Sequence, residues 1–252
     1  MPKMKYMMIF ALLTMLLYPV FYWLSRRTNV GPWRERLSRK ISPSMLFGIL
    51  LATSAALILS ASFMQDDAYI SFRYAKNLAS GNGMVWNIGD DRPVQGYTNF
   101  LWTALMALPI RLGINVEDST RVLGVAIGLL TIIFAYRLSV ELLESKRKAL
   151  FPVFLLSTNL SFLAYCTGGL ETQLVALLST LCWYTAFWVV NKKVKDNKGS
   201  ESIFSRRVIA LITSFVAGLA FLTRPDSILA TAPCIIYCIE ALRSDGSVRC
   251  RS

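Results

Sequence analysis

Two adjacent carboxylates, Asp66 and Asp67, are the side chains in this sequence best placed to do chemistry. They follow the apolar run 45–63 directly, and a third acid, Glu171, follows the apolar run 150–167. The chain contains no histidine, the commonest general base and a common transition-metal ligand. Acid–base chemistry here must therefore use carboxylates, and a metal held by Asp66 and Asp67 would be a hard divalent cation such as Mg²⁺, Mn²⁺ or Ca²⁺.

A structural role competes with this chemistry at each position. Asp66 can cap the helix that follows it, because its side chain can accept hydrogen bonds from the free backbone N–H groups of the first turn. Glu171 can cap a helix in the same way, and Arg224 and Asp226 can form an interfacial ion pair worth less than ~1 kcal/mol. A role in chemistry is favoured over a purely structural role, because acids and arginines from separate segments are expected at the same membrane depth. The loop beside them is rich in aromatic residues, namely Tyr69, Phe72, Tyr74, Trp86, Tyr97 and Trp102. These rings suit a sugar, although for Trp102 we favour an interfacial aromatic belt.

The elements that must position these side chains are membrane helices. The 54% hydrophobic content of the 252 residues and the mean hydropathy of +0.48 exceed what a soluble domain needs. Several apolar runs approach the ~20 residues of a transmembrane helix. We therefore expect an all-α, polytopic membrane protein with interfacial helices in one long loop. The seven expected transmembrane helices are residues 4–24, 44–63, 122–143, 150–167, 172–190, 208–222 and 228–242.

The basic residues orient these helices in the membrane. Together with Arg137, the loops 26–40, 146–148, 192–207 and 243–251 hold 19 of the 27 Lys and Arg residues. The same side of the membrane holds seven acids, namely Glu35, Glu141, Glu144, Asp196, Glu201, Glu240 and Asp245. The opposite side holds eight basic and eight acidic residues, so the net charge of +12 belongs to one face. This asymmetry is typical of cytoplasmic loops, and it disfavours a nucleic-acid partner.

With this orientation, residues 64–119 form a long extracytoplasmic loop. Ile70, Tyr74 and Leu78 recur at helical spacing and predict an amphipathic helix that lies along a surface, with these three residues on one face. Gly81-Asn82-Gly83 is expected to stop this helix. The apolar segment within 97–113 is about half of the ~20 residues that a bilayer requires, so we expect an interfacial or re-entrant helix there.

The motifs of this loop resemble a known family. Residues 66–87, which begin Asp66-Asp67-Ala-Tyr-Ile-Ser-Phe-Arg-Tyr, and residues 95–102, Gln-Gly-Tyr-Thr-Asn-Phe-Leu-Trp, are similar to the first extracytoplasmic loop of the GT-C membrane glycosyltransferases. The mycobacterial-type terminal β-(1→2)-arabinofuranosyltransferase group is the most similar. Gly169-Leu-Glu-Thr and Leu222-Thr-Arg-Pro-Asp226 resemble later short motifs of that group.

The resemblance implies transfer of a sugar, such as arabinofuranose, from a polyprenyl-phosphate donor to a glycan or lipid acceptor. The reaction would take place at the extracytoplasmic face of the plasma (inner) membrane. It implies catalytic roles for Asp66 and Asp67 and for Glu171 at the outer end of the fourth span. The departing phosphate requires cations, and the acceptor hydroxyl requires a base. The expected substrate-binding residues are Arg73, Tyr74, Arg92, Tyr97, Asn99, Arg224 and Asp226.

The chain departs from this family in two ways. The span 4–24 precedes the usual start, and the chain ends at Ser252, so we expect the later helices and the C-terminal domain of the family to be missing. We expect a single domain over 1–252, with an added segment 1–43, a core 44–242 and a tail 243–252. Two alternatives remain open, a transporter or flippase for a charged lipid, and a truncated, non-catalytic protein of GT-C type.

Overall fold

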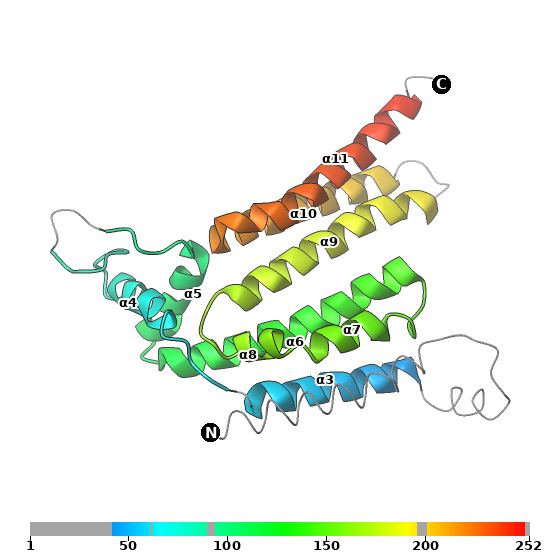
Figure 1. Ribbon diagram of the computed structural model, residues 1–252. Helices are drawn as coiled ribbons and strands as arrows, with labels where there is room; N and C mark the ends of the chain where they lie inside the picture. Colours follow the sequence, from blue (N-terminus) through cyan, green and yellow to red (C-terminus); the bar gives the residue numbers. More distant parts are fainter. Residues whose placement is uncertain (1–41, 61, 90–93, 196–200, 250–252) are drawn as a thin grey trace, which may run out of the picture. The chain divides into compact units, whose positions relative to one another are not determined.

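The computed structural model describes residues 42–60, 62–89, 94–195 and 201–249 (Figure 1). All regular secondary structure in these ranges is helical, as the sequence predicts. The described residues fall into two compact units. The first contains the chain up to Gln65 together with Thr120–Gly169, and the second contains Asp66–Ser119 and the chain from Leu170 onward.

The first unit is built from α3 (Pro43–Ser60), most of α6 (Val116–Leu143), α7 (Leu150–Ser157) and α8 (Leu160–Tyr165). Its core contains Leu50, Ile58, Ile132, Val153, Phe154 and Leu163. Two glycines of α6 allow Cys166, which follows α8, to approach α6 closely. A Cβ atom at Gly124 would overlap the carbonyl oxygen of Cys166, and a Cβ atom at Gly128 would overlap its Sγ. The turn that follows α8 is thereby seated directly on α6.

The expected span 150–167 is wrong as one continuous helix, because α7 and α8 are separate short helices. The break lies at Asn159, whose backbone is extended and whose side chain accepts the N–H of Phe162 at 2.9 Å. Thr158 donates its hydroxyl to the carbonyl of Phe154 and ends α7. Ser, Thr and Asn are typical of such N-terminal caps, so the run 157–159 carried the signal for this break.

The second unit contains three long helices that lie side by side, α9 (Thr172–Lys195), α10 (Glu201–Thr223) and α11 (Ile228–Arg249) (Figure 1). A short 3₁₀ turn, η1 (Pro225–Ser227), joins α10 to α11. The small buried side chains Cys182, Ala186, Ala217 and Cys234 lie between these helices, with Val189 and Cys238. This packing positions Glu171, the residue before α9, and Arg224, the residue after α10.

Four of the seven expected spans correspond to helices long and apolar enough to cross a membrane, namely Pro43–Ser60, Val116–Leu143, Thr172–Val189 and Pro225–Arg243. The span expected at 208–222 lies in α10, where the apolar part Arg207–Thr223 is shorter than those four helices. The span 4–24 lies outside the described residues. The structure therefore supports a multipass membrane protein, and it does not confirm the number seven.

The remaining helices of the second unit are α4 (Ala68–Ala79) and α5 (Phe100–Arg111), which pack against each other. The 12 residues of α5 rise ~18 Å, well short of a ~30 Å hydrocarbon core, so α5 is a short helix as predicted. α4 ends where the glycines predict, since Gly81 and Gly83 have φ values of 83° and 78°.

The three residues predicted to share one face of α4 differ in burial, because Tyr74 is buried, Leu78 is half-buried and Ile70 is exposed. Ile70 is 40% exposed, and the buried residues are Ala68, Ser71, Phe72, Tyr74 and Ala75. The small residues at 68, 71 and 75 follow the spacing of one helical stripe, which lets α5 approach closely.

Candidate functional site

Asp66 and Asp67 lie at the start of α4, and both residues are exposed. The predicted cap at Asp66 is not formed: the N-cap position is Asp67, and that side chain makes no capping hydrogen bond. Only the backbone carbonyls of the pair bond to the first turn, Asp66 to the N–H of Tyr69 and Asp67 to that of Ile70. Within the described part of the chain, neither carboxylate has a hydrogen-bond or ion-pair partner, so both are available to a ligand.

The segments that lead to Asp66 and to Glu171 are tied together inside the first unit. The N–H of Gln65 donates to the carbonyl of Gly168 at 3.0 Å, and the N–H of Phe63 donates to Thr167 Oγ1 at 3.3 Å. Gly169 follows with a φ of 84°, a conformation that favours glycine. The aspartate pair and Glu171 therefore leave from two neighbouring, hydrogen-bonded stretches of backbone.

Glu171 belongs to a buried polar cluster in the second unit. Asn99 Nδ2 donates to Glu171 Oε2 at 2.8 Å and to Ser71 Oγ at 2.9 Å. Thr103 Oγ1 donates to Asn99 Oδ1 at 3.0 Å. Asn99 and Glu171 are each 6% exposed, so this cluster joins α4, α5 and the start of α9 away from water.

Arg224 connects this buried cluster to the surface. Its Nη1 lies 3.6 Å from Glu171 Oε1, while Nε and Nη2 donate to the two oxygens of Asp226 at 3.1 and 3.0 Å. The side chains of Arg224 and Asp226 are 42% and 61% exposed. One guanidinium therefore serves two carboxylates, and the three residues carry a formal net charge of −1.

Arg73 is positioned on α4 by the loop that follows the helix. Its Nε donates to the Trp86 carbonyl at 2.9 Å, its Nη2 donates to Asn87 Oδ1 at 2.8 Å, and its Cζ lies 4.2 Å from the centroid of the Trp86 ring. Asn77 holds the same loop by donating to the carbonyls of Val85 and Trp86. All these partners are neutral, so the Arg73 charge is fixed in place but not compensated by any described acid.

Tyr74 has a supporting position in the structure. It is 1% exposed, its hydroxyl donates to the Val94 carbonyl and accepts the N–H of Gly96, both at 2.9 Å, and its ring packs edge-on against Tyr97. A Cβ atom at Gly96 would lie 2.8 Å from this hydroxyl, so a glycine is required there. Trp102, expected in an interfacial belt, is buried in α5.

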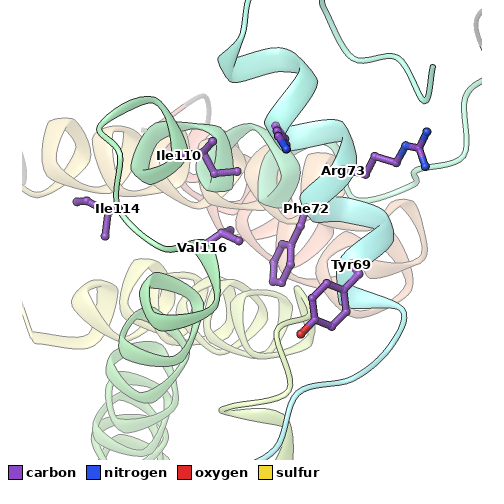
Figure 2. Close-up of a pocket in the computed structure, with 7 residues that line it drawn as sticks. Tyr69, Phe72, Arg73, Ile110, Ile114 and Val116 are labelled. Atoms are coloured by element: carbon purple, nitrogen blue, oxygen red, sulfur yellow. The ribbon is translucent and has the colours of Figure 1, made fainter. Parts of the chain in front are cut away.

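A pocket of about 380 Å³ lies beside α4 (Figure 2). It is lined by Tyr69, Phe72, Arg73, Lys76, Ile110, Ile114 and Val116. Figure 2 shows the Arg73 guanidinium extending away from Ile110 and Val116, at the edge of the pocket. Arg73 and Lys76 are both exposed, and neither pairs with an acid among the described residues. The pocket thus combines an apolar wall with two cations.

The structure brings together Asn99, Glu171, Arg224 and Asp226, and it places Tyr97 against Tyr74. Arg92 lies outside the described residues. In the described ranges, no three acidic or cysteine side chains are grouped as metal ligands. Sequence reasoning missed Ser71, Thr103 and Lys76. Lys76 follows Tyr69 and Arg73 at helical spacing, and Thr103 follows Asn99 by four positions, so the sequence carried a signal for both. Nothing in the sequence pairs Ser71 with Asn99.

Comparison with known proteins confirms the resemblance. The profile of the dolichyl-phosphate-mannose-protein mannosyltransferase family matches residues 98–246. Two relatives, each called terminal beta-(1->2)-arabinofuranosyltransferase, from Mycobacterium tuberculosis and Corynebacterium glutamicum, are both 27% identical to the chain, over 195 and 176 residues. These alignments cover 72% and 65% of this chain but 29% and 25% of the relatives, so it matches less than a third of their length. No solved structure matches the chain.

Proposed function

We propose that this chain, which belongs to the dolichyl-phosphate-mannose-protein mannosyltransferase family, moves a sugar from a polyprenyl-phosphate donor to a glycan or lipid acceptor. The site would face the extracytoplasmic side of the plasma (inner) membrane, and the names of the two relatives favour arabinofuranose as the sugar. The observation that carries the proposal is the pair of exposed carboxylates at the start of α4, which no described side chain engages.

The aspartate pair supplies the base. As the acceptor hydroxyl attacks the anomeric carbon of the donor sugar, its proton must leave, and a carboxylate oxygen within hydrogen-bond reach can accept it. Asp66 and Asp67 are exposed and have no capping role to give up, so either carboxylate can turn to the acceptor. One of the two acts as the base, either directly or through a divalent cation that the pair would hold.

The charges in the second unit favour different places for the phosphate and the sugar. The formal net charge of −1 at Glu171, Arg224 and Asp226 disfavours a phosphate there, although the sequence assigned Arg224 to phosphate binding. Among the residues that the structure describes, no acid pairs with Arg73 or Lys76, and both cations lie beside an apolar pocket. Two cations next to an apolar wall suit a phosphate that is attached to an isoprenoid chain. We therefore assign the donor phosphate to the edge of this pocket.

Glu171 is suited to the sugar itself. Glycosyl transfer passes through a transition state in which the anomeric carbon and the ring oxygen share positive charge. A buried carboxylate stabilises such charge more strongly than an exposed one, because little water screens it. The excess negative charge that makes this cluster unfavourable for a phosphate is therefore favourable for the reacting sugar.

A divalent cation would be held by Asp66 and Asp67. Two adjacent oxygen donors fit Mg²⁺ or Mn²⁺, because these ions are often bound by one or two carboxylates together with substrate phosphate and water. Such a cation would neutralise charge on the departing phosphate. Glu171 is already engaged by Asn99 and Arg224, so we do not include it among the ligands.

The experiment that tests the function is sugar transfer in membranes containing the chain, with a panel of polyprenyl-phosphate sugars. Asp66→Asn and Asp67→Asn should each lower kcat by ~10²-fold or more, and the double variant should be little worse than either. Thermal stability should hardly change, because no capping bond is lost. Asp118→Asn, an exposed acid in the first turn of α6, is the matched control and should transfer normally.

The same assay tests the proposed requirement for a divalent cation, since chelation should abolish sugar transfer and Mg²⁺, Mn²⁺ or Ca²⁺ should restore it. Sugar transfer that survives chelation, or that only Zn²⁺ restores, contradicts the proposed cation site. Near wild-type transfer by both asparagine variants contradicts the proposed base.

A further inference from the structure

We propose that Asn99 is the positioning residue for Glu171, holding one oxygen of that carboxylate so that the other faces Arg224 and the reacting sugar. This inference rests on the proposed function, in which Glu171 acts at the sugar. It assigns to Asn99 a role that acts through another residue, in place of the direct contact with substrate that the sequence suggested.

The Asn99 side chain does not form the capping bond that its position predicts. Asn99 is the N-cap residue of α5, and asparagine is among the residues most favoured there, because its side chain can bond to the free N–H groups of the first turn. It makes no such bond. The backbone N–H of Thr103 donates instead to the backbone carbonyl of Asn99 at 3.0 Å. The amide is thereby left for other partners.

The partners of the Asn99 amide fix its orientation. A carboxylate only accepts hydrogen bonds, so the NH₂ group of Asn99 must face Glu171 Oε2. The second N–H of this group donates to Ser71 Oγ, and the amide oxygen accepts the hydroxyl of Thr103. Both N–H groups and the oxygen are thus satisfied inside a buried site, and the amide has no freedom to turn.

This arrangement fixes one oxygen of the Glu171 carboxylate and directs the other toward Arg224. Oε2 is held by Asn99 from the α4–α5 side, while Oε1 faces Arg224 at 3.6 Å, beyond hydrogen-bond length. Arg224 is partly exposed and Ser71 is buried, so Oε1 is on the side that a ligand can approach. Removing the donor at Asn99 frees the carboxylate to rotate, and misplacement of a reacting group by ~1 Å can cost 10²-fold in rate.

The test compares kcat, KM and thermal stability of variants in membranes containing the whole chain. Asn99→Ala and Asn99→Asp should lower kcat by about 10- to 100-fold and change the donor KM much less, because the lost interaction acts in the transition state. Ser71→Ala removes a different bond of the same amide and leaves the bond to Glu171 in place, so it should lower kcat less than Asn99→Ala does. Asn159→Ala, an exposed asparagine N-cap in the first unit, is the matched control and should retain kcat.

A double-mutant cycle separates positioning from plain scaffolding. If Asn99 acts through Glu171, Asn99→Ala should cause little further loss in a Glu171→Gln background. The exchanged pair, Asn99→Asp with Glu171→Gln, can restore a hydrogen bond between the two side chains while moving the charge. It should recover much of the thermal stability lost in Asn99→Asp without recovering kcat.

The outcomes that overturn the inference are specific. Asn99→Ala with normal kcat, losses that add fully to those of Glu171→Gln, or an exchanged pair that recovers kcat together with stability would each contradict it. Glu171→Gln with wild-type transfer would instead overturn the role of Glu171 in the proposed function. A chain that transfers no sugar from any donor overturns the proposed function, and the assignment of Asn99 falls with it.

Discussion

At the scale of single residues, the structure separates side chains that can meet a ligand from side chains that hold the site together. Asp66 and Asp67 are exposed and unengaged by described residues, whereas Tyr74 and Asn99 are buried and their polar atoms are satisfied by protein. The sequence grouped all four as site residues, because residue type alone does not tell whether a polar atom already has a partner. Burial together with the hydrogen-bond inventory makes that distinction.

Tyr74 provides a prediction at this scale. Tyr74→Phe should lower the free energy of unfolding by ~1–3 kcal/mol, because the Val94 carbonyl and the Gly96 N–H each lose their partner in a partly buried place. Sugar transfer, measured at a temperature where the variant is folded, should stay near the wild-type rate. A large loss of transfer with unchanged stability would mean that the hydroxyl contacts the substrate, as the sequence suggested.

At the scale of elements, α4 presents two functional faces. Its stripe of small residues packs on α5 and carries Ser71 toward Asn99. A second stripe, Tyr69, Arg73 and Lys76, lines the apolar pocket (Figure 2). A helix can bury one face and offer charge on another because residues three or four apart share a face. The same short helix thus supports the buried cluster and bears the cations.

Lys76 tests the cationic stripe. Lys76→Gln should raise the KM for the polyprenyl-phosphate donor about tenfold and lower kcat less, since it removes one charge-assisted hydrogen bond to the phosphate. Lys76 is preferable to Arg73 for this test, because Arg73 also holds the Trp86 loop. Lys148→Gln, an exposed lysine before α7, serves as the control. An unchanged donor KM in Lys76→Gln would place the phosphate elsewhere.

At the scale of the whole molecule, the asymmetric loop charges predict which parts face outward. A cysteine at Ile88 should react with an impermeant thiol reagent added to intact cells, and a cysteine at Lys148 should react only after the cells are permeabilised. Both side chains are exposed, and Ile88 is preferable to its neighbour Gly89, whose φ of 87° disfavours any side chain.

The parent for this labelling should carry Cys250→Ser. The other four native cysteines, Cys166, Cys182, Cys234 and Cys238, are buried and should give little background. If Lys148→Cys is labelled in intact cells and Ile88→Cys is not, the extracytoplasmic placement of the aspartate pair is wrong.

The sequence by itself determined the helical class, four of the long apolar helices and the short length of α5, because these depend on the composition and length of local segments. It also indicated the family through short local motifs, and the family match over residues 98–246 confirms it. In these respects each stretch of chain carries its own signal, and no distant contact is needed to interpret it.

Tertiary structure alone decided which polar groups meet. Asn99 and Glu171 are 72 positions apart, and Ser71 and Asn99 are 28 apart, so no periodicity links them. The face that α4 buries also depended on contacts. A polar side chain takes the partner that burial leaves available, and that choice is fixed only when α4, α5 and the start of α9 come together around Asn99.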